Sequence, residues 1–359
     1  MKTMLYKITL FLLLLPAMLL ATNPSHTGKY TKEKKINKEY SVNANALLKV
    51  DNSYGNLYIT TWNQNRIEIE VHIKTSGNNE DKVQKKLDEI DVDFSASNAM
   101  VSAKTIFKKS SGWNWSWGSN NVSMEINYTI KMPVTNSVDL SNDYGGINLD
   151  ALDGVAKISC DYGKMNIGEL NADNNTLSFD YTSKSTIGYM KSGKISADYS
   201  GYEIDKAGNL IISADYTTSV IGEAGNLEFS CDYGSIKIGA VNNLQANGDY
   251  LTTKIGDVHG NVSLSSDYGS IKIDNLSSNA GNVEIRSDYA GIRIGYDPNY
   301  HFDFNIQLEY AGLSGKEDLN MSHSTEKSTE KHYEGYYGSK GKNKLSINSD
   351  YGSVKLYKN

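Results

Sequence analysis

The sequence predicts an all-β protein, a single-stranded β-solenoid (β-helix) built from coils of about 18 residues. An aspartate directly precedes a tyrosine ten times in the chain, and Glu309 with Tyr310 forms one further, altered copy. From Tyr144 to Tyr268 successive copies are 17 to 19 residues apart, and two steps of 21 residues follow. A period this short and steady indicates one small unit stacked on copies of itself.

Each repeat is predicted to contain two strands, because apolar residues alternate with polar ones on both sides of the tyrosine. The parity of this alternation changes across the tyrosine, so the chain must bend or bulge there. We expect the bend near the following residue, which is often glycine and tolerates a left-handed conformation. The predicted corner residues are Tyr144, Tyr162, Tyr233, Tyr268, Gly145, Gly163, Gly234 and Gly269. Nine coils stacked at about 4.8 Å would form a rod roughly 40 Å long.

Residues 1–21 are predicted to form a secretory signal peptide. Two lysines precede an apolar run over residues 8–20, and cleavage is expected after Ala21. A membrane anchor is the alternative, although the run is short for a span. The signal predicts export to the periplasm, the outer surface or the medium. The net charge of −6 argues against nucleic acid as a partner.

The rest of the chain divides into five predicted parts. These are a flexible, lysine-rich lead (22–40), a less regular N-terminal β part (41–137), the regular repeats (138–313), a polar loop or disordered insertion (314–342) and a final coil (343–359) that closes the rod. The N-terminal part contains a degenerate copy of the repeat around Tyr54. It also contains the one predicted helix, over residues 79–90, which Asn79 can cap.

Two cysteines follow the predicted signal, and we expect them to be small buried residues of the solenoid interior. Cys160 and Cys231 occupy the same place in the repeat, four coils apart. Stacking separates them by roughly 19 Å, too far for a disulfide. The six histidines are scattered and show no Cys/His metal spacing.

The repeated aspartates form a column of carboxylates, which repel their neighbours by roughly 1 kcal/mol at 4.8 Å even in water. One hypothesis is that each carboxylate accepts hydrogen bonds from backbone N–H groups at its own corner. The alternative is calcium bridging between coils, since calcium prefers hard oxygen ligands. The calcium candidates are Asp215, Asp232, Asp249 and Asp267.

Aromatic residues supply the candidate binding sites. Trp113, Trp115 and Trp117 would share one face of an extended segment. They would either cap an open end of the solenoid or contact a ligand or a membrane. The column of tyrosines would either pack the corners or stack on sugar rings.

The chain resembles a known family in its repeat motif. The Asn-x-Tyr-Gly-Asn-Leu segment starting at Asn52, the Thr-Thr-Trp-Asn at 60–63 and the Ser-x-Asp-Tyr-Gly-x-Ile copies resemble the bacterial putative-adhesin family of unknown function. They are similar, more loosely, to auto-transporter adhesin head (GIN) domains. The resemblance covers most of residues 41–357 and implies an exported or membrane-associated β-solenoid without defined catalytic residues.

Together these observations predict an exported, non-enzymatic β-solenoid that acts as a surface or periplasmic adhesion, interaction or structural protein. Its expected partner is a protein or glycan of the cell envelope, and no cofactor is expected apart from the calcium alternative. A periplasmic envelope-stress component and a glycan-active β-helix enzyme are the alternatives. Against an enzyme, the acidic residues follow the repeat, whereas a polysaccharide-cleaving site needs acids that break it on one face.

Overall fold

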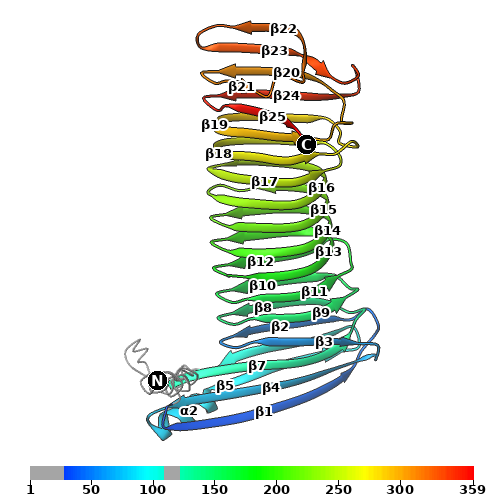
Figure 1. Cartoon of the computed structure of the whole chain (residues 1–359). Helices are drawn as coiled ribbons and strands as arrows, with labels where there is room; N and C mark the ends of the chain where they lie inside the picture. The colour runs from blue at the N-terminus through cyan, green and yellow to red at the C-terminus, as the bar shows by residue number, and fades with distance from the viewer. Residues whose placement is uncertain (1–27, 109–121) are drawn as a thin grey trace, which may run out of the picture.

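The computed structural model describes residues 28–108 and 122–359, so the predicted signal peptide and the three tryptophans at 113–117 lie outside the described residues. The described chain is a long rod, mostly β, with 72% of residues in strands and one short helix (Figure 1). Among these residues, no helix is long and apolar enough to cross a membrane.

The strands follow one another along the rod almost in chain order. They are β1 (Tyr30–Ser41), β2 (Leu47–Ser53), β3 (Leu57–Trp62), β4 (Arg66–Gly77), β5 (Ile90–Ser97), β6 (Met100–Phe107), β7 (Val122–Pro133), β8 (Ser137–Asp143), β9 (Ile147–Leu152), β10 (Ala156–Asp161), β11 (Met165–Leu170), β12 (Asn175–Asp180), β13 (Ser185–Asp198), β14 (Gly201–Asp215), β15 (Thr218–Ser230), β16 (Gly234–Asp249), β17 (Leu251–Val258), β18 (Val262–Leu276), β19 (Val283–Tyr296), β20 (Phe302–Glu309), β21 (Leu313–Ser314), β22 (Asn320–Glu326), β23 (Glu330–Tyr337), β24 (Asn343–Asp350) and β25 (Val354–Lys358). The single helix, α2 (Glu80–Glu89), lies between β4 and β5.

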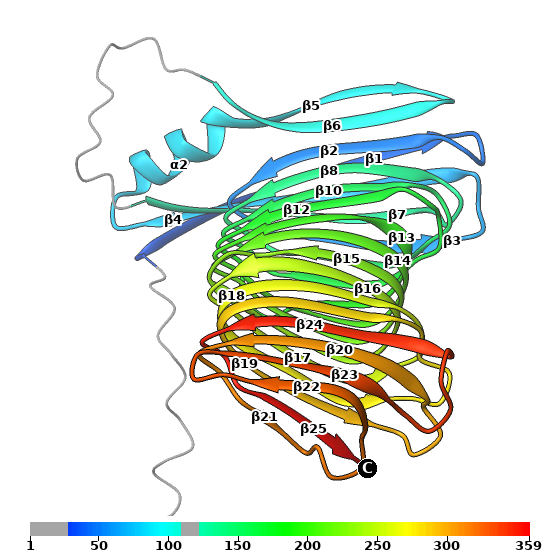
Figure 2. The ribbon, with the colours of Figure 1, turned by 90° about the horizontal axis from the view of Figure 1, so that it is seen from above.

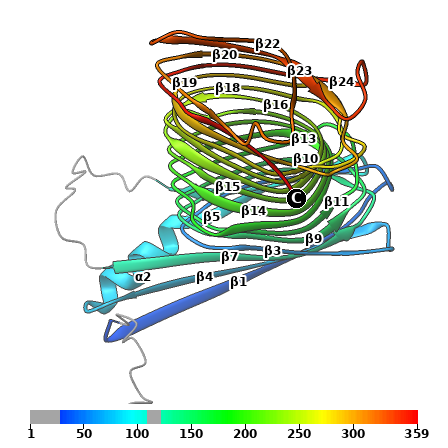
Figure 3. The same cartoon turned by 45° about the horizontal axis from the view of Figure 1, so that its top comes forward.

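The repeats stack in parallel and in register, as a solenoid-like fold requires. Equivalent residues of successive coils pair directly: Leu210 pairs with Leu227, and Ile212 with Phe229. These side chains are buried, and their equivalents form one continuous apolar core through the rod. Figures 2 and 3 show the coils wound above one another. Each coil takes the name of its corner tyrosine.

The bend predicted at the residue after the tyrosine lies instead on the tyrosine itself. All twelve corner tyrosines, from Tyr54 to Tyr351, have a left-handed φ between 50° and 64°. Of the predicted corner glycines, Gly145, Gly163 and Gly234 do not have a positive φ, and Gly269 has φ 157°. One left-handed residue reverses which face the next side chain points to, which explains the change of parity.

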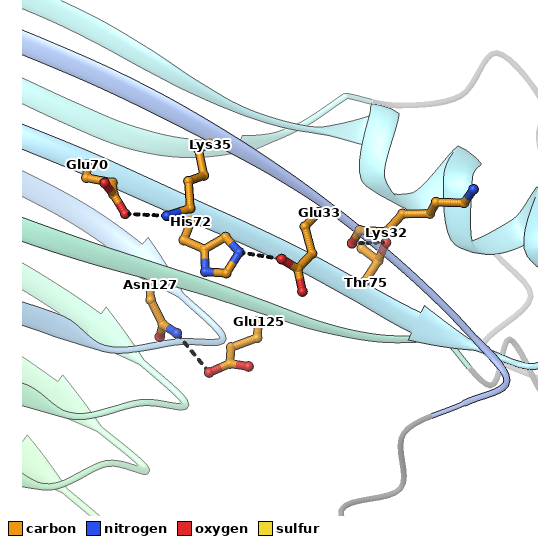
Figure 4. Close-up of polar contacts among 8 residues, drawn as sticks. All are labelled: Lys32, Glu33, Lys35, Glu70, His72, Thr75, Glu125 and Asn127. Carbon is orange, nitrogen blue, oxygen red and sulfur yellow. Dashed lines mark hydrogen bonds and ion pairs between the residues drawn. The ribbon is translucent and has the colours of Figure 1, made fainter.

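Residues 22–40 were expected to form a flexible lead. This prediction is wrong from Tyr30 on, because β1 forms there and pairs antiparallel with the whole of β4. Charged side chains of β1 contact side chains of β4 (Figure 4). Lys35 contacts Glu70 at 3.1 Å, and Glu33 contacts His72 at 3.0 Å. β1 lacks regular apolar alternation because it is an edge strand. Charged edges of this kind also hinder pairing with other molecules.

The predicted helix is confirmed as α2. The Asn79 side chain accepts a hydrogen bond from the Lys82 backbone N–H, as an N-cap does. Val83 and Leu87 are buried, and the helix lies against β1 and β4 at the N-terminal end of the rod (Figure 2).

Residues 314–342 were expected to form a polar loop or a disordered insertion. This prediction is also wrong, since the segment forms the antiparallel hairpin β22–β23. β23 pairs antiparallel with β20, so the hairpin covers the C-terminal end of the rod. The sequences of β22 and β23 are mostly polar, so they lack the apolar alternation that identifies a strand. Tyr333 of β23 is nevertheless buried against the core.

The last coil of the chain does not close the rod, contrary to expectation. β24 pairs in parallel with β19 on one side and with β20 on the other. β25 likewise pairs with both β19 and β21. The coil of Tyr351 is therefore inserted between the coils of Tyr289 and Tyr310, and the Tyr310 coil with its hairpin forms the end.

Candidate functional site

The corner tyrosines form one continuous ladder of stacked rings along the rod. Neighbouring ring centroids are 4.7 to 5.3 Å apart, and their planes differ by at most 8°. The spatial order is Tyr54, Tyr144, Tyr162, Tyr181, Tyr199, Tyr216, Tyr233, Tyr250, Tyr268, Tyr289, Tyr351 and Tyr310.

This stacking decides what the tyrosines can do. Each inner ring has both faces covered by its neighbours, so a sugar ring has no free aromatic face to stack on. The side chains are still half exposed, for example 52% for Tyr216, so their edges and hydroxyls face solvent. Aromatic pairs stabilise by about 0.5–1.5 kcal/mol beyond burial, which helps offset a left-handed backbone costing about 1–2 kcal/mol at each tyrosine.

The aspartate before each tyrosine forms a second column, with a hydrogen bond between coils. In the middle of the rod, the Oδ1 atom of one aspartate accepts from the backbone N–H of the aspartate in the next coil. Asp232 N donates to Asp215 Oδ1 at 2.9 Å, and Asp249 N donates to Asp232 Oδ1 at 3.0 Å. The carboxylates thus bond to backbone N–H groups, as one hypothesis expected, but to those of the neighbouring coil.

Two members of this column have shifted pKa values. Burial raises the pKa of Asp288, and the carboxylates of Asp267 and Asp350 above and below raise it further. Burial and the nearby carboxylates of Asp161 and Asp51 raise the pKa of Asp143 in the same way. In both cases burial is the larger cause, and the neighbouring negative charges add to it.

Calcium binding by Asp215, Asp232, Asp249 and Asp267 stays a prediction. The structure brings these four carboxylates into one column, as the sequence predicted. Within residues 28–108 and 122–359, however, no group of three or more His, Cys, Asp or Glu side chains is arranged to hold a metal ion.

An open groove of about 1380 Å³ runs along the described surface. It crosses eight coils, from the Tyr181 coil to the Tyr351 coil, so it runs roughly 34 Å along the rod. One column of its lining is asparagine: Asn209, Asn226, Asn243, Asn261 and Asn282. The parallel column two residues further on is exposed and mixed: Ile211, Glu228, Gln245, Ser263 and Glu284. We call this feature the asparagine groove.

The asparagines are bonded to each other along the groove. Asn226 Nδ2 donates to Asn209 Oδ1 at 2.6 Å, and Asn243 Nδ2 donates to Asn226 Oδ1 at 2.7 Å. Farther along, Asn261 Oδ1 accepts from the Asn282 backbone N–H at 2.9 Å. A side-chain amide has two N–H donors and an acceptor oxygen with two lone pairs, so this ladder leaves hydrogen-bonding capacity facing the groove.

Sequence reasoning missed this groove. Its signal is a recurrent Gly-Asn pair seven residues before the tyrosine, as at Gly208-Asn209 and Gly225-Asn226. Glycine and asparagine are typical of turns, and the pair indicates only a corner. The alignment of these corners in one open groove comes from the stacking.

The two cysteines are free and buried, as the sequence predicted. Burial raises the pKa of both the Cys160 and the Cys231 thiol to about 12. The thiolate is the reactive form, so both side chains act as small core residues and neither belongs to a site.

Comparisons with known proteins give likenesses among solved structures only; no family model and no curated protein matches the chain. A putative adhesin from Parabacteroides merdae is 11% identical, with 92% of this chain and 98% of that chain covered and a TM-score of 0.34. A putative cell adhesion protein from Clostridium sporogenes is 12% identical, with 91% and 100% covered and a TM-score of 0.19. A putative lipid binding protein from Parabacteroides distasonis is 11% identical, with 90% and 96% covered and a TM-score of 0.24. The chain is thus similar over about nine-tenths of its length to several bacterial proteins described as putative adhesins.

Proposed function

We propose that this chain is an exported, non-enzymatic β-solenoid that acts as an adhesion or interaction protein of the cell envelope, and that the asparagine groove holds an extended, uncharged glycan. The observation that carries the proposal is the groove itself. It is open, it crosses eight coils, and it is lined along its length by side-chain amides. A long ligand with repeating polar groups matches a long surface with repeating polar groups.

The chemistry of the lining favours sugar hydroxyls. Hydroxyls both donate and accept hydrogen bonds, as the amides of the asparagine column and of Gln245 do. Charges are few on this lining, and the carboxylate of Glu284 is already paired with Arg286 at 2.6 Å. An uncharged glycan therefore fits this groove better than a strongly charged polymer does.

The acidic residues of the groove also support a binding role over a catalytic one. Glu228 and Glu284 are its two carboxylates, and sheet pairing places them three coils apart. Three steps of about 4.8 Å make roughly 14 Å, whereas glycoside-cleaving carboxylates lie about 5–9.5 Å apart. No pair in the groove has that separation.

A blocking experiment tests the proposal, and the buried native thiols make it selective. Ser263→Cys places one reactive thiol on the exposed lining of the groove, and Glu203→Cys places one outside it as the matched control. Each protein is screened on an array of uncharged glycans before and after attachment of a bulky maleimide. Unlabelled Ser263→Cys is expected to bind as the wild type does, which shows that it folds.

Labelling at position 263 is expected to abolish glycan binding, while labelling at position 203 leaves it intact. If no uncharged glycan binds, or if the labelled groove binds as before, the proposed ligand is wrong. The bound glycan is then incubated with the protein and its chain length measured. Shortened products would overturn the non-enzymatic assignment in favour of a glycan-active enzyme.

A further inference from the structure

A column of cations occupies one face of the C-terminal half of the rod. It lies four residues after the corner tyrosine, on the strand that follows the corner, whereas the asparagine groove lies before the corner. Pairing in the sheet stacks its members directly on one another: Lys237, Lys254, Lys272, Arg293 and Lys355. Four steps of about 4.8 Å make this basic column roughly 19 Å long.

The cations of this column are largely uncompensated. Lys272 is paired with Asp274 at 2.5 Å. Lys237, Lys254, Arg293 and Lys355 are exposed, and none of these four forms an ion pair or side-chain hydrogen bond with another residue of the described chain. Like charges stacked this closely repel one another, and the whole protein carries a net charge of −6. The column is thus a positive stripe on a negative protein.

The fold does not require a cation at this position, because the same column continues through the N-terminal half with other residues. There, in the same register, the occupants are Asn148, Asn166, Thr186, Glu203 and Val220. These coils have the same backbone pairing and the same corner tyrosines. Only the C-terminal half carries cations in this column, and the architecture does not demand them.

The surroundings of the column leave the charges accessible. The column two residues before it carries small hydroxyl side chains, Ser235, Thr252 and Ser270. Two residues after it, Gly239, Gly256 and Gly295 have no side chain, and the other two positions are Asp274, which pairs with Lys272, and Tyr357. A ligand can therefore approach the ammonium groups closely and also bond to the flanking hydroxyls.

We propose that the basic column binds a linear acidic polysaccharide laid along the rod axis, with successive carboxylate or sulfate groups on successive coils. A single file of cations fits a single-file polyanion and is too narrow to hold both strands of a nucleic acid duplex.

Single-stranded nucleic acid binding depends on bases stacking on aromatic rings. The inner rings of the tyrosine ladder have both faces covered, so they cannot provide that platform. This site is separate from the asparagine groove and does not depend on the function proposed for it.

Affinity electrophoresis through gels containing alginate tests the proposal, with dextran gels as the uncharged reference. The test variant is the triple substitution Lys237→Gln, Lys254→Gln and Arg293→Gln. Its control, Lys85→Gln, Lys164→Gln and Lys342→Gln, removes the same charge from exposed positions elsewhere. Val220→Lys adds a sixth cation next to Lys237.

Alginate is expected to retard the wild type and the control equally, and dextran is expected to retard neither through this column. The test variant should bind alginate about tenfold more weakly or worse, as the loss of three exposed ionic contacts implies. Val220→Lys should bind more tightly, and all alginate binding should weaken as salt is raised. The labelled groove variant, Ser263→Cys, should bind alginate normally, so failure of one site does not mimic failure of the other.

Three results would overturn the proposal. The first is equal loss of alginate binding in the test and control variants, which would mean that only net charge matters. The second is retention by single-stranded DNA or by anionic vesicles with none by alginate, which would assign the column to another class of partner. The third is unchanged alginate binding in the test variant.

Discussion

The ring of Tyr351 stacks on the ring of Tyr289 with centroids 4.7 Å apart, although the Tyr310 coil and a hairpin come between them in the chain. The last coil therefore fills a gap between two coils that precede it in sequence. Its strands β24 and β25 supply both neighbours with parallel partners. The C-terminal end of the rod is therefore complete only when residues 343–359 are in place.

Deletion of residues 343–359 is expected to release the C-terminal end of the rod. β19 and β20 would each lose a paired strand and expose an edge. Amide hydrogen exchange in β20 and in the hairpin β22–β23 should accelerate strongly, and the protein should self-associate. Tyr351→Phe is the control and should behave as the wild type. Unchanged exchange in β20 after the deletion would mean that the end is stable without the inserted coil.

The repeat made the stack, the presence of a corner and the buried cysteines predictable, because each follows from period and alternation. The bend itself was expected near the residue after the tyrosine and lies on the tyrosine. The edge elements were not predictable in that way. β1 alternates charge rather than apolarity, and its stability comes from pairing with β4. The hairpin β22–β23 likewise depends on its partner β20. The spatial order of the coils could not be predicted either, since nothing in the sequence of residues 343–359 shows that they pair between two earlier coils.

Substitutions at Tyr216 are expected to follow an unusual order of stability. Tyr216→Phe should be nearly neutral, because the ring keeps both stacking partners, Tyr199 and Tyr233. Tyr216→Ala should lose roughly 2 kcal/mol as two aromatic pairs are removed. Tyr216→Gly should be more stable than Tyr216→Ala by about 1 kcal/mol, because φ at this position is 51°. Denaturant unfolding measures all three. If Tyr216→Gly is less stable than Tyr216→Ala, as it would be in an ordinary strand, the left-handed backbone at the corner is not a source of strain.

Asp288→Asn is expected to stabilise the protein at neutral pH. The pKa of Asp288 is raised in the fold, so the native state binds its proton more tightly than the unfolded state does. The contribution of this group to stability therefore falls as the pH rises through the unfolded and then the folded pKa. The variant should gain a few tenths to about 1 kcal/mol at pH 7, from relief of screened repulsion. That gain should shrink as the pH is lowered toward 4.

Asp215→Asn is the matched control for this measurement. Asp215 Oδ1 accepts a hydrogen bond from the Asp232 backbone N–H, and a charged acceptor makes that bond stronger. Its replacement should therefore give a smaller gain or a loss at pH 7. Equal gains at both positions would show that repulsion alone, and not the pattern of hydrogen bonds, governs the aspartate column.

Excess chelator is expected to leave the thermal unfolding midpoint unchanged. The aspartates of the middle coils already bond to backbone N–H groups, which offsets their repulsion without a cation. Differential scanning calorimetry with and without chelator, and after adding calcium back, measures this directly. A midpoint that falls with chelator and recovers with calcium would instead assign a calcium site to Asp215, Asp232, Asp249 and Asp267.

Trp115→Ser is expected to leave stability within about 0.5 kcal/mol of the wild type. The N-terminal end of the rod is already covered by β1, β5 and the helix α2, so Trp115 is not needed as a cap. Trp62→Ser is the contrasting variant and should be destabilising. The Trp62 indole donates a hydrogen bond to the Arg66 carbonyl at 3.0 Å and lies 4.8 Å from the Arg66 guanidinium. Denaturant unfolding of both is paired with binding to a glycan array and to lipid vesicles. Lost binding with stability intact would make Trp113, Trp115 and Trp117 a contact site, whereas lost stability would make them a cap.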